Sequence, residues 1–486
     1  MTFPPSFDAQ VAQVLAAHRA WEGQLPPFEA DAATLVDPAV MEAMTTELCE
    51  RLRENYPHFH PLYAGQMLKP PHPAAVIGYL AAMLVNPNNH ALDGGRATAA
   101  MEKEAVAAIA SMFGYEGNGF LGHLTASGTI ANLEALWIAR ELAPQRVIAI
   151  GEDAHYTHRR ACELLRVEVA TVRSRPDGTM DLDALDRVLA RGDIGTVVAT
   201  LGTTALGALD PLPAIVERAH AASARVHVDA AYGGYFRLLA GDDPACAPFQ
   251  ATSGADSIVV DPHKHGLQPY GCGCVLFKDG EVAKKYAHDS PYTYFSSPLH
   301  HPGETTFECS RAGAAAAALW MTLRCIPLQD RAAKGGADDG SAGGSAGGSA
   351  TRDGQRGGMK AIVARCRTGA KAFADLVRDH DDLRLLIEPT LDIVCYFARG
   401  PRSIRARGSE ISAATDRIFE RAAASTEAPL HLAKLEVNAD RFLALCPDVD
   451  VDVERVRVLR SCLMKPEQAT WAGQIVRHLE AAIAPD

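Results

Sequence analysis

The sequence lacks an excess of positive charge and any apolar run long enough to span a membrane. Lysine and arginine together number 47 against 59 aspartate and glutamate, which leaves a net charge of −12 over 486 residues. A chain with this balance has no basic field for phosphate backbones or anionic lipid, so we expect no nucleic-acid partner. The longest apolar stretch, residues 74–85, is well short of the roughly 20 residues that a spanning helix needs. We therefore expect no membrane association.

A disulfide framework is also missing. The 11 cysteines are an odd number without regular spacing, which is typical of reduced thiols in a cytoplasmic protein. The amino end has neither the basic nor the apolar segment of a secretory leader, which favours the same location. Cys272 and Cys274 have no partners at metal-ligand spacing, so we expect them to be strand residues and predict no metal site.

The pattern along the chain predicts four segments. Residues 1–60 have helical apolar spacing and precede any strand, so we expect an N-terminal arm. Residues 61–332 form the expected large domain. Residues 333–358 repeat glycine, serine and alanine, which cannot bury enough apolar surface to fold, and predict a flexible linker of natural or engineered origin. Residues 359–486 mix helical and strand patterns and predict a smaller α+β domain.

Short runs rich in valine and isoleucine alternate with helical patterns in the large domain. These runs cover residues 147–150, 196–202, 225–229, 257–261 and 274–277. Such alternation predicts an α/β fold with a mostly parallel sheet and helices on both faces. Ligands of such sheets bind at the carboxyl ends of the strands, so the residues that follow each run are the candidates for function.

Lys264 follows the apolar run at 257–261. Lysines are mostly exposed, so one interpretation is a surface charge at a turn. The other is an amine whose pKa is lowered by desolvation and which forms a Schiff base with a carbonyl compound. His263 and His265 flank it, either as proton carriers or as polar turn residues.

Asp229 closes the run at 225–229. A carboxylate at the end of a buried strand needs a cationic partner or hydrogen-bond donors. The protonated ring nitrogen of pyridoxal phosphate is such a partner, and capping of the next helix is the alternative. The small side chains of Ala230 and Ala231 would let a flat ring approach the backbone.

Ser127, Gly128 and Thr129 precede a helical pattern, where free N–H groups favour a phosphate. Serine and threonine caps also precede many helices that bind nothing.

Two further runs end in polar residues. Thr203 and Thr204 follow one run and are candidates to bond a cofactor or a substrate carboxylate, and His155 follows another. His155 is a candidate to stack on an aromatic ring, or an ordinary loop residue. Because these polar residues follow several strands that end at the same edge of the predicted sheet, they predict a single cofactor pocket.

The segments TASGTIANLEAL, DAH, ATLGTT, HVDAAYGG and DPHKHG resemble, in order and spacing, the pyridoxal-phosphate-dependent group II amino acid decarboxylases. The resemblance is strong over residues 55–330. It implies the aspartate-aminotransferase-like fold type I, with a seven-stranded large domain and a smaller C-terminal domain. It also implies a homodimer with shared active sites and a small-molecule substrate, an amino acid.

The resemblance implies a role for each matching residue. Lys264 would be the Schiff-base lysine with His263 beside it, Asp229 would pair with the pyridine nitrogen, and His155 would stack on the ring. The implied cofactor-binding set also includes Gly128, Thr129, Thr204, Ala231 and Ser310, of which Ser310 could come from the partner subunit.

The implied reaction is decarboxylation of an L-amino acid to an amine and CO₂. Either Tyr292 or Tyr294, in the loop after the lysine, would protonate the substrate carbon once CO₂ has left. Asp261 before Pro262 is close to the pattern of the sphingosine-phosphate lyases, so a retro-aldol carbon–carbon lyase is an alternative, as is a transaminase on the same fold. The substrate stays open.

Overall fold

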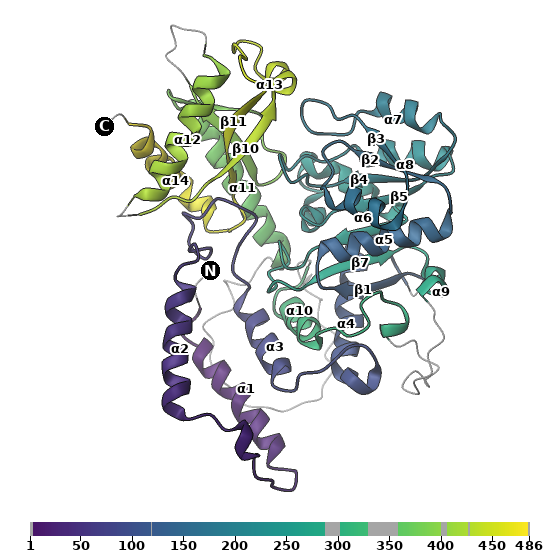
Figure 1. Cartoon of the computed structure of the whole chain (residues 1–486), viewed down its shortest axis with the longest axis vertical. Coiled ribbons are helices and arrows are strands. Elements are labelled where there is room, and N and C mark those ends of the chain that lie inside the picture. The colour runs from purple at the N-terminus through teal and green to yellow at the C-terminus, as the bar shows by residue number, and fades with distance from the viewer. Residues whose placement is uncertain are drawn as a thin grey trace, which may run out of the picture.

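A computed structural model describes residues 3–117, 119–286, 302–328, 358–399, 406–425 and 428–484. A seven-stranded sheet and a four-stranded sheet organise this part of the chain. In Figure 1 they form two bodies side by side, and two N-terminal helices extend away from both.

The large sheet is mostly parallel, as the sequence predicts. Its strand order is β1-β7-β6-β5-β4-β2-β3, and β7 is the strand that runs antiparallel to its neighbours. The strands are β1 (Leu121–Thr125), β2 (Val147–Gly151), β3 (Val169–Val172), β4 (Ile194–Thr200), β5 (Arg225–Asp229), β6 (Ser257–Val260) and β7 (Gly273–Phe277). The strands β2, β4, β5, β6 and β7 lie within two residues of the five predicted runs, whereas β1 and β3 correspond to no predicted run.

Helices cover both faces of this sheet, which explains why its central strands are apolar at every position. In β6, Val259 packs in a cluster with α5, whereas Ile258 and Val260 pack in the cluster that contains α4 and α8. The helices of this body are α3 (Pro73–Met83), α4 (Leu92–Phe113), α5 (Gly128–Leu142), α6 (Thr157–Leu165), α7 (Leu182–Leu189), α8 (Leu212–Ala221), α9 (Ala283–Tyr286) and α10 (Gly313–Cys325). Short 3₁₀ turns join some of them: η2 (Gly234–Leu239), η3 (Pro244–Gly254), η4 (Gly280–Val282) and η6 (Pro302–Glu304).

The C-terminal sheet is antiparallel, with the order β10-β11-β9-β8. Its strands are β8 (Leu383–Leu385), β9 (Ile393–Ala398), β10 (Ala433–Asn438) and β11 (Arg455–Cys462). The helices are α11 (Gly358–Asp379), α12 (Gly408–Ala424), α13 (Ala439–Leu445) and α14 (Gln468–Ile483). Met359 and Val363 at the start of α11 belong to one hydrophobic cluster that contains Ile258 of the large sheet and Ile393 of β9, so the core is continuous between the two bodies.

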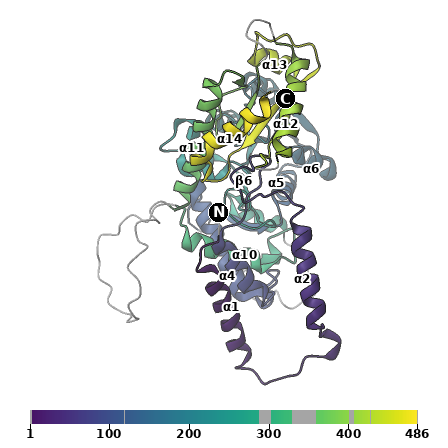
Figure 2. The same cartoon turned by 90° about the vertical axis from the view of Figure 1, so that its left-hand side faces the viewer.

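The N-terminal helices α1 (Phe7–Glu22) and α2 (Pro38–Leu52) bury none of their residues. The short turn η1 (Ala32–Thr34) lies between them, and Figure 2 shows both helices projecting from the body in the same direction. Across the described ranges, we find no helix with the length and apolar character that a membrane crossing requires.

Candidate active site

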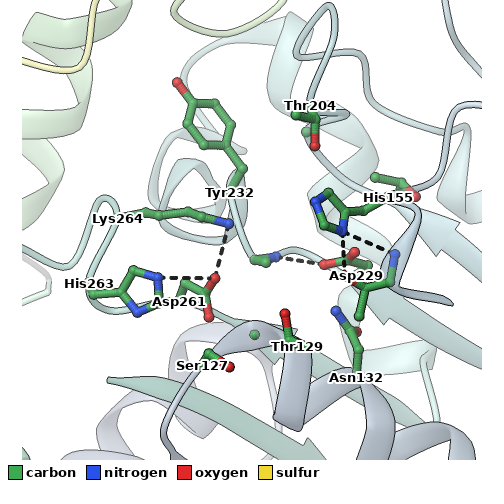
Figure 3. Close-up of a pocket in the computed structure, with 15 residues that line it drawn as sticks. Ser127, Thr129, Asn132, His155, Thr204, Asp229, Tyr232, Asp261, His263 and Lys264 are labelled. Atoms are coloured by element: carbon green, nitrogen blue, oxygen red, sulfur yellow. Dashed lines mark hydrogen bonds and ion pairs between the residues drawn. The ribbon is translucent and has the colours of Figure 1, made fainter. Parts of the chain in front are cut away.

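A pocket lies where several strands of the large sheet end, beside the first turn of α5 (Figure 3). It encloses about 190 Å³. The lining residues are Ser127, Gly128, Thr129, Asn132, His155, Thr157, Thr200, Gly202, Thr204, Asp229, Ala231, Tyr232, Asp261, His263 and Lys264. The structure therefore brings together nine of the candidate residues singled out in the sequence: Ser127, Gly128, Thr129, His155, Thr204, Asp229, Ala231, His263 and Lys264.

The first turn of α5 forms the floor of this pocket in Figure 3. The backbone of Ser127 is extended, and its hydroxyl accepts the N–H of Ile130 at 3.4 Å, which caps the helix. A Cβ on Gly128 would lie 2.6 Å from Oδ2 of Asp261, so glycine is required for this close approach. The unpaired N–H groups of such a turn, together with the hydroxyls of Ser127 and Thr129, suit an anion.

Lys264 extends into the pocket from the turn after β6. Its Nζ lies 3.0 Å from Oδ2 of Asp261, and its side chain is 21% exposed. Nε2 of His263 lies 3.5 Å from the same oxygen, while Nδ1 of His263 is 2.9 Å from the carbonyl oxygen of Cys272. Burial lowers the pKa of His263, against the opposing charge of Asp261. The lysine is thus a partly buried amine that faces the pocket beside a carboxylate, not a charge on the open surface.

Asp229 lies opposite Lys264 in Figure 3, at the end of β5. Its Oδ2 is 2.8 Å from Nε2 of His158, and its Oδ1 accepts the N–H of Ala231 at 3.0 Å. Burial raises the pKa of Asp229, but the hydrogen bond and charge of His158, the Ala231 N–H and the charge of Lys264 outweigh burial and hold the pKa below its usual value. Asp229 is therefore an ionised carboxylate at the pocket wall.

His158 is a functional candidate that the sequence analysis missed. It lies on the first turn of α6 and is fully buried. The sequence does place a second histidine three positions after His155, in the segment that follows a predicted strand. No local pattern, however, indicates that His158 pairs with Asp229.

His155 and Thr204 line the pocket near Asp229. Nδ1 of His155 is 2.6 Å from Oγ1 of Thr157, and burial lowers the pKa of His155, so its ring is neutral. The carbonyl oxygen of Thr204 accepts Nη2 of Arg460 at 2.5 Å. Arg460 comes from β11, so the C-terminal body holds the backbone of this pocket loop, another contact that sequence reasoning missed.

Other residues of the sequence analysis lie elsewhere. Thr203 is buried, and its hydroxyl accepts the N–H of Ala208 at 3.0 Å. The Ser310 hydroxyl accepts Nδ2 of Asn88 at 3.1 Å, outside the residues that line the pocket. Tyr292 and Tyr294 lie outside the described residues.

The sequence is similar to curated decarboxylases over most of its length. It is 27% identical over 436 residues to an L-tyrosine decarboxylase of Enterococcus faecium, covering 67% of this chain and 71% of that protein. It is 28% identical over 384 residues to an L-aspartate decarboxylase of Thermococcus kodakarensis, covering 76% of this chain and 89% of that protein.

Solved structures share the fold. The structure of Oryza sativa TDC with PLP and tryptamine superposes with a TM-score of 0.74 at 19% identity, covering 99% of this chain and 100% of that one. Mouse CSAD in apo form gives a TM-score of 0.73 at 18% identity, with 98% of each chain covered. The sequence profile of the pyridoxal-dependent decarboxylase conserved domain matches residues 37–330. Because this match covers more than half of the sequence, the chain belongs to the pyridoxal-dependent decarboxylase family.

Proposed function

We propose that this carboxy-lyase removes the carboxyl group of an L-amino acid at the pocket just described, giving the amine and CO₂, with Lys264 and Asp229 as the central catalytic pair. The observation that carries the proposal is the placement of a partly buried amine and an ionised carboxylate on opposite sides of one pocket. Pyridoxal phosphate, when bound, supplies a cationic ring that accepts the electron pair left on the substrate carbon as CO₂ departs.

The residues present fit this cofactor. A flat ring needs an acid beside its nitrogen, and Asp229 is ionised and faces the pocket. A phosphate needs N–H donors and hydroxyls, and the first turn of α5 has both at Ser127, Gly128 and Thr129. An aldehyde needs an amine, and Lys264 is the only lysine among the lining residues of the described pocket.

We assign the covalent attachment to Lys264. Its Nζ must lose a proton before it can attack a carbonyl carbon. Oδ2 of Asp261 lies 3.0 Å from that nitrogen and is placed to hold the proton, and His263 at 3.5 Å from the same oxygen can receive it further from the reacting atoms. With the cofactor bound, Lys264 would hold it covalently, and whenever its Nζ is released, Asp261 at 3.0 Å would leave it placed for later proton transfers.

We assign retention of the ring charge to Asp229. Its ionised state is supported by the buried imidazole of His158 on one oxygen and by the Ala231 N–H on the other. His158 therefore acts as a positioning residue. His155, neutral and beside Asp229, would hold a flat ring by stacking, and Thr204 lines the same pocket.

We further propose that the enzyme is a homodimer. The helices α1 and α2 bury no residue in the described chain and carry an unusual density of exposed apolar side chains. These include Trp21 of α1 and Val40, Met41, Met44, Leu48 and Leu52 of α2. Apolar surface of this kind is rarely left open, and a second copy would cover it. In such a dimer Ser310 would contribute to the partner's pocket.

A direct screen of L-amino acids would identify the substrate class. The relatives are decarboxylases of tyrosine and of aspartate, so an aromatic and an acidic side chain are the first two candidates. Release of CO₂ from each L-amino acid, with matched formation of the amine, measures the reaction. Cleavage to an aldehyde without CO₂ would instead favour the carbon–carbon lyase.

The test of the site begins with the absorbance of the purified protein. We expect a cofactor band that disappears on borohydride treatment, with the reduced label on the peptide that contains Lys264. A protein that stays colourless with added pyridoxal phosphate, or a label on another lysine, would refute the proposal.

A further inference from the structure

A buried polar cluster lies directly behind the pocket, between the two bodies of the chain. Asp392 comes from the segment just before β9 of the C-terminal sheet and is fully buried. It meets two residues of the large domain, Tyr232 and His265, which are also buried. Neither His265 nor Asp392 belongs to the pocket lining, so the proposed reaction leaves them without a role.

Each of these two contacts reaches a catalytic loop. The hydroxyl of Tyr232 donates to Oδ1 of Asp392 at 2.5 Å, and Tyr232 lies three residues after Asp229 and lines the pocket. Nε2 of His265 lies 3.2 Å from Oδ2 of Asp392, and His265 is the residue after Lys264. One carboxylate therefore contacts the Asp229 loop through one oxygen and the Lys264 loop through the other.

The two loops also touch each other at this point. The rings of Tyr232 and His265 meet edge to face, with centroids 5.0 Å apart. Phe236 packs against the same imidazole at 5.0 Å. The imidazole is thus enclosed, and Asp392 is the acidic group that faces it.

The charge of Asp392 is sustained by its surroundings. Burial raises the pKa of Asp392, but the contact with His265, the Tyr232 hydroxyl and the charge of Lys69 together hold it below the usual value. An ionised acid that is fully buried favours keeping its partners in place, because moving Tyr232 away would remove its hydrogen-bond donor and moving His265 away would remove the imidazole that faces its other oxygen.

His265, Asp392 and Cys366 lie close enough to resemble a metal site, with ligand atoms within 4.8 Å of one another. Two observations disfavour a cation. Sγ of Cys366 donates to the carbonyl oxygen of Met464 at 3.1 Å, and burial raises the pKa of this thiol to about 12, so it is not a thiolate. Lys69 adds a positive charge beside the Cys366 thiol, which also disfavours a bound cation.

We propose that Asp392 is a positioning residue that fixes the Lys264 loop and the Asp229 loop relative to each other, so that the cofactor pocket reaches its binding geometry only when the C-terminal body is docked. This inference rests on the function proposed above. It assigns to the C-terminal body a direct part in building the pocket, through His265 and Tyr232.

Asp392→Asn tests the proposal, since an amide keeps the shape and an acceptor oxygen but removes the charge. We expect its dissociation constant for pyridoxal phosphate, measured by titration of the apoenzyme, to rise about tenfold or more, as for loss of a buried charged hydrogen bond. We also expect a weaker circular dichroism signal of the bound cofactor at saturation, and a lower kcat with little change in KM. The matched control is Asp153→Asn, which removes the ion pair of Asp153 with Arg441 between the same two bodies, away from the pocket lining.

Tyr232→Phe and His265→Asn provide a second route that does not remove the acid. When either substitution is combined with Asp392→Asn, the double variant should lose less cofactor affinity than the sum of the two single losses, because the three residues act as one unit. If Asp392→Asn does not fold, these two single variants decide, and wild-type affinity in both would overturn the proposal.

The outcomes separate this inference from the proposed function. If the wild-type protein does not bind pyridoxal phosphate, the function itself fails. If the wild type binds and Asp392→Asn binds equally well, or loses no more affinity than Asp153→Asn, the positioning role is refuted. Stoichiometric zinc in the purified wild type that is lost in Asp392→Asn would also overturn it, in favour of a coordination site.

Discussion

Replacement of His158 by phenylalanine should raise the pKa of Asp229, the residue that we propose lies beside the cofactor ring. The substitution keeps a flat ring of similar size but removes the Nε2 atom that lies 2.8 Å from Oδ2 of Asp229. Both side chains are buried, so solvent cannot replace the lost partner. Asp229 would retain only its bond to the Ala231 N–H.

The magnitude follows from the type of contact. A hydrogen bond to a charged group contributes roughly 1.5–3 kcal/mol, and we expect the apoenzyme to lose about that much unfolding free energy. By the same scale, the affinity for pyridoxal phosphate should fall by about 10- to 150-fold. His158→Gln, whose side-chain amide can still donate, should recover part of both losses.

The change should also appear in the pH dependence of stability. The pKa of Asp229 in the folded protein lies below the ordinary value of about 3.9. A depressed folded pKa gives stability that is fully present above the unfolded pKa and is lost as the pH falls towards the folded pKa. His158→Phe raises the folded pKa, so the difference between variant and wild type should be largest at neutral pH and shrink on acidification below about pH 4.

A matched control is available on the surface. Nε2 of His220 lies 3.3 Å from Oδ2 of Asp256, which is the same chemical pair with the imidazole 45% exposed. His220→Phe should change the unfolding free energy by about 0.5 kcal/mol or less. Denaturant unfolding of the apoenzymes and cofactor titrations measure both variants. Equal effects of the two substitutions would refute the argument that burial makes the His158 contact important.

Three further predictions concern other parts of the pocket. Lys264→Ala should abolish the borohydride-sensitive absorbance band and the label, and covalent cofactor in this variant would contradict our assignment. Gly128→Ala should lower cofactor affinity at least tenfold with the fold retained, because its Cβ would meet Oδ2 of Asp261 at 2.6 Å, and titration of the apoenzyme measures this. Arg460→Met should also lower cofactor affinity, because the carbonyl of Thr204 loses the donor that lies 2.5 Å away and the Thr204 loop is no longer held by β11. Unchanged affinity would show that the loop keeps its position without Arg460.

The local elements were largely determined by the sequence. The strands β2, β5 and β7 coincide with runs of β-branched and apolar residues, and α5 begins at the residue after the predicted cap, Ser127. These features depend on neighbours in the chain, because periodicity and capping act over a few residues. The parallel topology then carries the ends of β5 and β6, with Asp229 and Lys264, to the same edge.

The partners of the site were decided by the tertiary structure alone. His158 and Asp229 are 71 positions apart, Tyr232 and Asp392 are 160 apart, and Arg460 and Thr204 are 256 apart. No local pattern encodes such pairs, because which side chains meet depends on how α6 packs on the sheet and how the C-terminal body docks. The sequence thus determined which residues can carry the chemistry, whereas the packing of distant segments decided which charges face them and hold them in place.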